Sequence, residues 1–369
     1  MREILLVIDS LGSGGAQRQM SLLALGLKRN DYKVMVFVCH AGHNHFRSPL
    51  EDNHIDILEV DTGQNKGFRF KVFWELYRLV QKRPACIISF LPSSNFYAAL
   101  VSILTRRTLI TSQRSSSEAK LSLTRNLAQF FSHFCSSYIT CNSFAEASRI
   151  KRDYPAFAKK VETVWNGYIL DKTVTPRKSY KLSRSLLVVA RIAHMKNGYR
   201  LLEALLLFQE RNGWLPEVRW AGRKEQDKES VKMQEEMGRF LKHHEDISQK
   251  MKWLGEVADL EQLYKEADAL VHISLFEGLP NSICEAMLFG CPVIASNVCD
   301  HPILLGNGER GILCDPYTKE SICTALERIY LMAEPERAKM TSSARVYAVD
   351  RLDLKNMIGR YKDLVDTTL

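Results

Sequence analysis

The chain has 369 residues, of which 46% are hydrophobic and 25% are charged, and its formal net charge is +9. These fractions are typical of a globular protein, and they exclude disordered, fibrous and collagen-like chains. The length is too great for one ordinary core and predicts two domains of roughly 150 to 200 residues each.

The first half of the chain alternates between strands and helices. Short apolar runs predict strands at 3–8, 33–39, 55–60, 85–90, 108–112, 137–141 and 161–165. Helical periodicity predicts helices between them, at 17–29, 69–82, 95–104, 120–133 and 144–153. This order predicts a mostly parallel, doubly wound sheet.

A glycine-rich loop, Gly12 to Gly15, follows the first strand and opens the first helix. It is similar to the dinucleotide-binding fingerprint, but Gln17 stands where the third glycine belongs, and no acidic residue ends the second strand. A ligand loop and a tight turn without a ligand both remain open. Arg114, at the end of a later strand, is a candidate to bind a phosphate.

Residues 171–185 show no apolar periodicity and contain Pro176 and several basic side chains, which predicts a linker. Beyond it, a second series of strands is predicted at 186–190, 217–221, 252–254, 269–274, 293–296 and 311–314. The expected domains are therefore residues 1–170 and 186–350, and residues 351–369 form a last helix.

Arg191 and Lys196 lie in the loop that follows the strand at 186–190. Arginine can bind two phosphate oxygens at once and lysine adds a point charge, so the pair suits a diphosphate. A solvated surface is the alternative. His194, in the same loop, is expected on the surface, and His272 is expected to pack within its strand.

Glu277 and Glu285, with seven residues between them, are the most informative residues of the chain. Glu277 follows the strand at 269–274, at the edge where open α/β sheets bind ligands. The loop at 278–281 then presents a helix N-terminus to phosphate or sugar oxygens, and carboxylates accept bonds from sugar hydroxyls. Two plainer interpretations stay open: a solvated Glu277, and a capping box in which Ser282 and Glu285 close the following helix.

Around these glutamates the sequence resembles the retaining glycosyltransferases of family 4, which have the GT-B fold and share this glutamate pair. The matching residues follow the family order and spacing: Trp253 to Val257, Leu263, Tyr264, Ala267, Asp268, Ser274, Glu277, Gly278, Glu285 to Met287, Gly290 and Pro292 to Ser296. The sequence at 279–281 is similar to a branch that extends lipid-linked bacterial oligosaccharides. The resemblance implies two Rossmann-like doubly wound domains that face each other across a cleft, with the C-terminal helix crossing back to the first domain.

The resemblance also implies roles for individual residues. Arg191 and Lys196 would stabilise the leaving diphosphate, while Glu277 would hold the donor sugar and Glu285 the ribose. The other implied donor-binding residues are Gly278, Leu279, Pro280, Asn281, Gly14, Gly15 and Gly255. The possible acceptor or cleft residues are Arg18, Asn95, Arg114 and Asn166.

The chain departs from the family pattern in two places. Many members place a histidine of the first domain near the reacting sugar, but residues 89–95 contain none, and the stretch from Gly222 to Lys224 lacks the second glycine that many members have there. No two aspartates are separated by a single residue, so the metal clamp of GT-A transferases is missing. We expect neither a metal nor a cofactor, because basic side chains and helix N-termini would neutralise the diphosphate.

We therefore expect a retaining glycosyltransferase, of the hexosyl or N-acetylhexosaminyl type, that moves a sugar from a nucleotide sugar to a glycan. Family frequency favours a UDP-sugar. The resemblance to the lipid-linked branch favours a polyprenyl-diphosphate-linked acceptor in the synthesis of O-antigen, capsule or a related surface polysaccharide. Two alternatives remain: a GT-B-fold sugar-nucleotide epimerase, which needs no acceptor, and a non-catalytic nucleotide-sugar-binding protein.

The net positive charge of the chain lies wholly in its first half. Residues 1–165 contain 22 Lys and Arg against 13 Asp and Glu, while the remaining residues contain 29 of each. We expect this half to face a membrane surface or a lipid diphosphate, and not nucleic acid, because no nucleic-acid module is recognised. The stretch at 121–134, with Phe130, Phe131 and Phe134, either presses on the bilayer or packs in the core.

No apolar run approaches the ~20 residues that span a bilayer, and the first residues do not resemble a secretory leader. The nine cysteines are scattered without a Cys-x-x-Cys pair, which favours buried thiols in a reducing compartment. We therefore expect a cytoplasmic protein that binds peripherally to the inner face of the cytoplasmic membrane.

Overall fold

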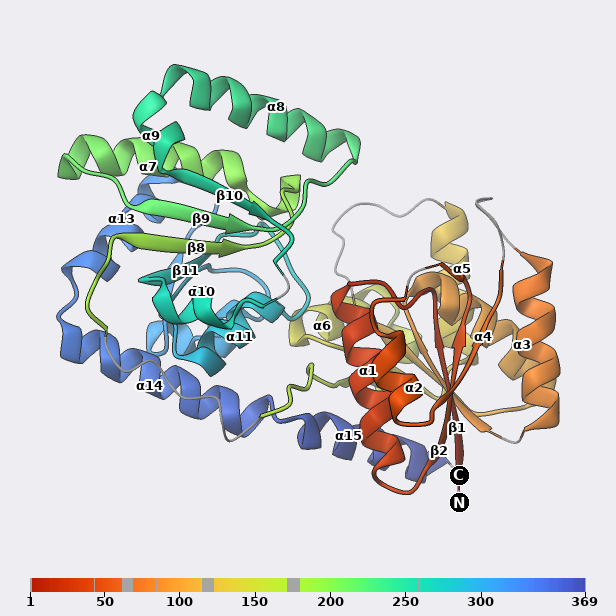
Figure 1. Cartoon of the computed structure of the whole chain (residues 1–369). Coiled ribbons are helices and arrows are strands. Elements are labelled where there is room, and N and C mark those ends of the chain that lie inside the picture. The colour runs from red at the N-terminus through yellow and green to blue at the C-terminus, as the bar shows by residue number, and fades with distance from the viewer. Residues whose placement is uncertain are drawn as a thin grey trace. The chain divides into compact units, whose positions relative to one another are not determined.

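The computed structural model describes residues 2–42, 44–61, 69–83, 85–114, 123–170, 180–257 and 259–368. The chain divides into two compact units, Met1–Ile169 with Leu352–Leu369, and Leu170–Arg351 (Figure 1). Most of the expected linker, residues 171–179, lies outside the described residues, and Ser185 already begins the first strand of the second unit.

The sheet of the first unit contains seven parallel strands in the order β3-β2-β1-β4-β5-β6-β7. Their bounds are β1 Glu3–Ile8, β2 Lys33–Val38, β3 Asp56–Glu59, β4 Ala85–Phe90, β5 Leu109–Gln113, β6 Tyr138–Cys141 and β7 Val161–Thr163. The central strands are continuous apolar runs because helices bury both faces of the sheet.

Helices cover both faces of this first sheet. One face carries α1 (Gly15–Lys28), α2 (Arg47–Asp52) and α15 (Leu354–Thr368). The other face carries α3 (Phe70–Lys82), α4 (Pro92–Thr105), α5 (Leu123–Cys135), α6 (Phe144–Asp153) and a 3-10 helix, η1 (Pro155–Lys160). The sequence did not predict α2, which buries a single apolar side chain, Leu50.

The last helix, α15, belongs to the first unit although the chain enters it from the second. Backbone bonds between Tyr168 and Leu352 (2.8 Å), and between Leu354 and Tyr168 (2.9 Å), fix its start. At Gly26 of α1 a Cβ atom would lie 1.9 Å from Cδ1 of Ile358, so α15 approaches α1 closely at this glycine. The expected return of the C-terminal helix to the first domain is confirmed.

The second unit repeats the same plan. Its six parallel strands have the order β10-β9-β8-β11-β12-β13 and the bounds β8 Ser185–Val189, β9 Glu217–Ala221, β10 Met251–Gly255, β11 Ala269–His272, β12 Val293–Ser296 and β13 Ile312–Cys314. Its helices are η2 His194–Lys196, α7 Gly198–Asn212, α8 Lys228–His243, α9 Glu245–Lys250, α10 Glu261–Glu266, α11 Asn281–Phe289, α12 His301–Leu304, η3 Gly306–Gly308, α13 Lys319–Leu331 and α14 Glu334–Arg351. The expected α/β class with two doubly wound sheets is confirmed.

Both sheets reverse their strand order at one point, between β1 and β4 in the first unit and between β8 and β11 in the second. The loops after these strands diverge toward opposite faces, so the carboxyl ends leave a crevice there that α/β proteins use for ligands. The strand order therefore directs attention to the loops after β8 and β11, which carry Arg191, Lys196 and Glu277.

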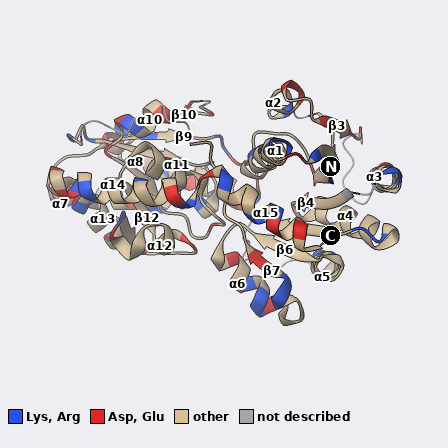
Figure 2. Cartoon of the chain, turned by 90° about the horizontal axis from the view of Figure 1, so that it is seen from below, with Lys and Arg blue, Asp and Glu red and all other residues tan. Residues whose placement is uncertain are grey.

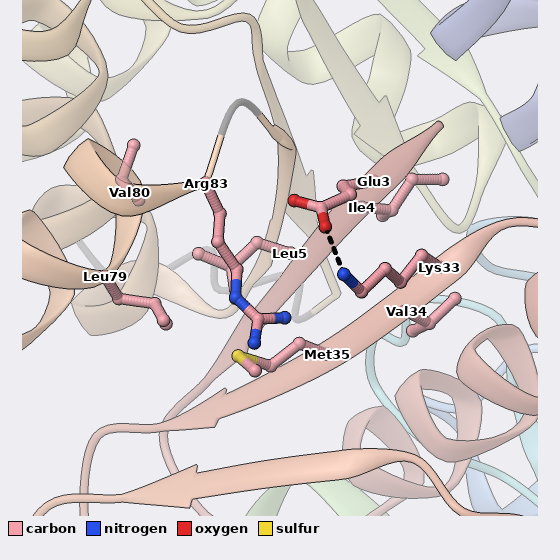
Figure 3. Close-up of a pocket in the computed structure, with 9 residues that line it drawn as sticks. All are labelled: Glu3, Ile4, Leu5, Lys33, Val34, Met35, Leu79, Val80 and Arg83. Carbon is pink, nitrogen blue, oxygen red and sulfur yellow. Dashed lines mark ion pairs between the residues drawn. The ribbon is translucent and has the colours of Figure 1, made fainter. Parts of the chain in front are cut away.

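A small pocket lies at the opposite edge of the first sheet, where β1 and β2 begin (Figure 3). Glu3 and Lys33 form an ion pair of 2.7 Å across its mouth, and Arg83 comes from the end of α3. Because ligands of open parallel sheets bind beyond the carboxyl ends of the strands, this pocket at their amino ends receives no functional role.

His133 of α5 is a buried ring whose two nitrogens have no hydrogen-bond partner among the described residues. Its ring meets the edge of Tyr154 at a centroid distance of 5.1 Å. Burial lowers the pKa of His133 to about 4, and nearby Arg149 and Lys160 add to the effect. Below its unfolded pKa of ~6.5 the unfolded chain therefore binds a proton that the folded chain does not, and stability falls as pH falls.

We expect His133→Phe, which keeps the ring contacts, to flatten this acid dependence. Between pH 6.5 and pH 5 the wild type should lose about 2 kcal/mol more than the variant, since each pH unit contributes about 1.4 kcal/mol per group. Thermal unfolding across this range measures it, with exposed His243→Gln as the control. Identical pH profiles for the wild type and His133→Phe would contradict the assignment.

Candidate functional site

Two loops meet at the switch point of the second sheet. One follows β8 and contains η2, and the other follows β11 and leads into α11. The backbone N–H of Leu275 donates to the carbonyl of Met195 at 2.9 Å, and Asn197 donates through Nδ2 to the carbonyls of Ile273 (3.3 Å) and Pro316 (2.8 Å). These bonds fix the positions of the charged side chains that the loops carry.

Glu277 lies at the centre of this site. Its Oε1 atom accepts from Nζ of Lys196 in an ion pair and from Oγ of Ser274 at 2.8 Å, and it lies 3.2 Å from Nε2 of His272. The side chains of Glu277 and Lys196 are only 15% and 14% exposed. Burial by itself would raise the pKa of Glu277, but Lys196 and His272 together hold it well below its usual range.

Glu277 is therefore anionic at neutral pH, and the interpretation of it as a solvated surface residue is wrong. Among the residues that the structure describes, none donates to its second oxygen, Oε2. A carboxylate oxygen that is charged and has no protein donor is suited to accept a hydrogen bond from a substrate hydroxyl.

His272 of β11 is buried, as expected, but it also bonds to the site. Its Nδ1 atom lies 3.0 Å from Oγ of Ser282, while Nε2 faces Glu277. Burial lowers the pKa of His272, so the ring is neutral, and the carboxylate assigns its proton to Nε2. The sequence contained a signal for this role of His272. Residues two apart in a strand lie on the same face, and Ser274, two residues after His272, is one of the residues that match the family pattern.

Glu285 is also buried, on the second turn of α11. The phenol of Tyr264 donates to its Oε2 atom at 3.1 Å, and burial, aided by Glu285, raises the pKa of that phenol far above its usual range. The capping-box interpretation is wrong, because α11 begins before Ser282, at Asn281, and the Ser282 hydroxyl bonds to His272.

Arg191 forms an ion pair with Glu225, from the loop after β9, and its side chain is 51% exposed. The two loops run close together: a Cβ atom at Gly222 would lie 2.0 Å from the carbonyl oxygen of Ala190, and Gly222 has φ +153. Glycine is therefore required at 222, whereas Arg223 uses its carbonyl to accept from Ile192 at 2.8 Å. The departure from the family pattern lies within this stretch, Gly222 to Lys224, whose backbone pairs with Ile192 of the loop after β8.

The remaining donor-site candidates divide by burial. Leu279 and Pro280 are buried, so their side chains shape the loop, while Gly278 and Asn281 are partly exposed at the start of α11. Gly255 ends the outer strand β10 with φ +67, next to the half-exposed Trp253.

Three candidates of the first unit come together around Ser112 at the end of β5. Asn95 donates through Nδ2 to the Ser112 carbonyl (3.2 Å), and Arg114 donates to the Ser112 hydroxyl (3.1 Å) and to Oδ1 of Asn166 (2.7 Å). Arg114 also donates to the phenol of Tyr361 on α15 at 3.2 Å and lies 3.9 Å from the ring centre of Phe90. The cluster therefore holds α15 in place through Tyr361. It also lies at the carboxyl ends of the strands, the edge at which such sheets bind ligands, here called the ligand edge.

The glycine-rich loop of the same unit connects β1 to α1. Gly14 caps α1, Gly15 begins it, and Arg18 lies over the ring of Tyr168 at 5.6 Å. Gln17, which broke the dinucleotide fingerprint, donates to Oδ1 of Asp9 at 3.1 Å.

Asp9 and His40 are titratable residues at this edge that the sequence did not single out. Asp9 follows β1, and burial raises its pKa although the N–H of Ser10 lowers it. Burial, and then Arg69, lower the pKa of His40, which lies beyond the end of β2. Their places directly after predicted strands were the available signal. His40 is a histidine on the ligand edge, although it does not lie in the segment where many family members have one.

Within the described ranges, no group of three His, Cys, Asp or Glu is arranged to hold a metal ion. No helix in the part of the chain that the structure describes has the length and apolar character to cross a membrane. All nine cysteines are free thiols.

Comparison with known proteins gives matches along most of the chain. Residues 174–347 match the family model for glycosyl transferases group 1, and residues 13–172 match the model for glycosyltransferase family 4. A relative from Campylobacter jejuni, GalNAc-α-(1→4)-GalNAc-α-(1→3)-diNAcBac-PP-undecaprenol α-1,4-N-acetyl-D-galactosaminyltransferase, is 24% identical over 94% of this chain and 93% of its own length.

Two further proteins extend the comparison. A capsular polysaccharide biosynthesis glycosyltransferase of Staphylococcus aureus is 22% identical over 81% of this chain and 82% of its own length. The crystal structure of Anabaena HepE with UDP and glucose superposes with a TM-score of 0.82 at 19% identity, covering 99% of this chain and 100% of the other. This likeness supports the fold.

The buried ion pair predicts an asymmetric response to mutation. Lys196→Met should lower the free energy of unfolding by about 3 kcal/mol, because it leaves a buried carboxylate without its cation. The double variant Lys196→Met with Glu277→Gln should recover part of that loss. The wild-type pair contributes stability above the unfolded pKa of about 4.3, and this contribution is lost as pH falls toward the lowered pKa of Glu277.

Urea unfolding of the single and double variants measures this coupling. As a matched control, Arg200→Met breaks a more exposed pair with Glu203 and should cost less than about 1 kcal/mol. Losses at Lys196 and Glu277 that simply add would contradict the coupling.

Proposed function

The chain belongs to the group 1 and family 4 glycosyltransferases, and from this premise we propose that it moves a sugar, with retention, from a UDP-sugar to a lipid-linked glycan. The observation that supports this most is the pairing of Lys196 with Glu277 at the switch point of the second sheet. Lys196 is a cation that can bind the diphosphate, and Glu277 is a carboxylate that can bind sugar hydroxyls. Together they match the two groups that are joined by the bond between the nucleotide and the sugar.

We propose the following division of roles. Arg191 and Lys196 stabilise the charge that develops on the leaving diphosphate, with the N-terminus of α11 as a further source of positive potential. Glu277 binds a hydroxyl of the donor sugar through Oε2, and Glu285 accepts from the ribose. No metal is assigned to the reaction. The attack is on the front face, so the departing diphosphate oxygen takes the proton of the acceptor hydroxyl and no protein nucleophile is needed.

The relatives support the choice of substrates. The Campylobacter jejuni enzyme bears an undecaprenyl-diphosphate-linked saccharide in its name, and the Staphylococcus aureus relative is named for capsule synthesis. The Anabaena structure contains UDP. We propose, by extension, a polyprenyl-diphosphate-linked acceptor in the synthesis of a surface polysaccharide such as O-antigen or capsule.

The first test is thermal stabilisation by UDP-, GDP- and ADP-sugars, with and without EDTA, followed by transfer to an undecaprenyl-diphosphate-linked saccharide. One UDP-sugar at 100 times its Kd should stabilise the protein by about 2.7 kcal/mol, since it binds only the folded state. Conversion of the donor without a glycan product would indicate an epimerase instead, and binding without turnover would indicate a binding protein. A loss of stabilisation in EDTA would contradict metal-free binding.

A pair of variants at one contact sharpens this test. Arg191→Ala removes a phosphate ligand and should lower kcat/KM about 10- to 100-fold. Glu225→Gln removes the carboxylate that competes for Arg191 and should lower KM for the donor. A decrease of kcat/KM in both variants, or an increase in both, would contradict the assigned role of Arg191.

We also propose that the first unit binds an anionic membrane surface. On α5 the side chains of Leu123, Leu127, Phe130 and Phe134 form an exposed row at helical spacing, here called the α5 stripe. Of the predicted aromatic set, Phe131 packs into the core beneath, while the half-exposed Phe130 contacts the buried Phe157 with ring centroids 5.2 Å apart. Residues 121 and 122, at the start of the predicted stretch, lie outside the described residues.

The neighbouring surface has the same character. On α3 the rings of Phe70 and Trp74 are exposed and stacked, with centroids 6.0 Å apart, and α4 contacts both α3 and α5. Exposed basic residues lie on the same helices: Lys71, Arg78 and Lys82 on α3 and Arg125 on α5. Figure 2 colours the basic positions of α3 blue. Apolar rings and leucines among basic side chains are typical of a surface that binds at the lipid interface.

Liposome flotation tests this surface. The wild type should float with anionic vesicles, less so in high salt, and Leu127→Asp with Phe134→Asp should lose most of the floating fraction. Leu331→Asp, at an even more exposed apolar position on α13, serves as the matched control and should float like the wild type. Equal flotation of all three proteins would contradict the proposal that the α5 stripe contacts the membrane.

A further inference from the structure

One oxygen of Glu277 holds three donors from separate segments. Lys196 comes from η2, His272 from β11 and Ser274 from the loop beyond β11, and all three converge on Oε1. Only Lys196 carries a full positive charge, because burial keeps His272 neutral. The compensation of a buried carboxylate therefore depends on one cation.

That same cation is assigned to the diphosphate of the donor. A diphosphate brings at least two negative charges and attracts the ammonium group, so Lys196 cannot neutralise Glu277 as fully once the donor is bound. An uncompensated buried carboxylate is costly, and the nearest group able to respond is His272, 3.2 Å from Oε1.

The surroundings of His272 permit a second protonation state. Its Nδ1 atom faces the Ser282 hydroxyl at 3.0 Å, and a hydroxyl can donate to a bare nitrogen or turn to accept from N–H. The charged or titratable groups that face the ring, among the described residues, are Lys196, Glu277 and His301. The centroid of the His301 ring lies 5.3 Å away, and burial lowers the pKa of His301 to about 3, so it stays neutral and does not oppose a charge on His272.

We propose that His272 is a positioning residue that keeps the Glu277 carboxylate in place through Nε2–H when the donor engages Lys196, and that it then takes up a proton from solvent at Nδ1. This inference rests on the proposed function for the role of Lys196 toward the donor. The bond between His272 and Glu277 orients the free Oε2 atom toward the sugar. When the ammonium group of Lys196 pairs with the diphosphate, the positive charge acquired by His272 compensates Glu277 in its place.

The charge coupling can be measured without any transfer reaction. Histidine-labelled protein is titrated by NMR, and the His272 signal is identified by its loss in His272→Gln and by its shift in Ser282→Ala. The pKa of His272 should rise by about one unit or more in Lys196→Met, because a nearby positive charge has been removed. Saturation of the wild type with UDP should raise it in the same direction. An unchanged pKa in Lys196→Met would overturn the proposal.

Kinetics with the proposed UDP-sugar and lipid-linked acceptor separate positioning from packing. His272→Leu fills the space without a donor and should lower kcat/KM about 10- to 100-fold, the range for a hydrogen bond to a charged group. His272→Gln keeps an N–H near the position of Nε2 but cannot gain a proton, so it should recover part of the lost activity and no more. Equal losses in both variants would overturn the positioning role.

The outcomes also distinguish this inference from the proposed function. Coupling in the titration without any sugar transfer would support the role of His272 while the transferase proposal failed. Transfer that is sensitive to Arg191→Ala but unaffected by His272→Leu would sustain the proposed function and overturn the inference.

Discussion

The burial of a charged carboxylate, Glu277, is the constraint on which the candidate site depends. An ionised carboxylate is stable away from water only when a cation and hydrogen-bond donors surround it. Here those partners come from the loops after β8 and β11 and from β11 itself. Because the strand order places β8 beside β11, the topology of the sheet brings the charge and its partners to one place.

The same requirement explains why both expected phosphate ligands are already paired. Lys196 is held by Glu277 and Arg191 by Glu225, so each of these cations already has a counter-charge in this structure. A diphosphate would therefore bind by exchange of partners. The exchange costs less at Arg191, whose pair is half-exposed and screened by water, than at Lys196, whose pair is buried. The buried pair is consequently the one that needs a compensating group, and His272 is placed to supply it.

Much of this arrangement could be predicted from the sequence, and the rest shows where local patterns fail. Apolar runs located every strand of both sheets because parallel strands are buried on two faces. Local spacing could not decide between a capping box and a ligand site at Ser282, since the answer depended on His272 of another element. Nor could periodicity decide that the α5 stripe is exposed, because a helical apolar row looks the same whether it faces a core or a solvent.

The first unit holds a partly buried cation, Arg114, in a different way. Arg114 has three of its five N–H groups engaged by neutral partners, Ser112, Asn166 and Tyr361, and the ring of Phe90 covers one face. Neutral groups satisfy the donors without cancelling the charge, and burial lowers the pKa of Arg114. A ligand that displaced these neutral partners from Arg114 would also break the contact of Arg114 with Tyr361 on α15. A ligand that displaces a carboxylate from a cation has no such effect on a helix. In the second unit the proposed phosphate ligands are paired with carboxylates that a ligand could displace, whereas in the first unit Arg114 helps to hold the helix that completes the fold.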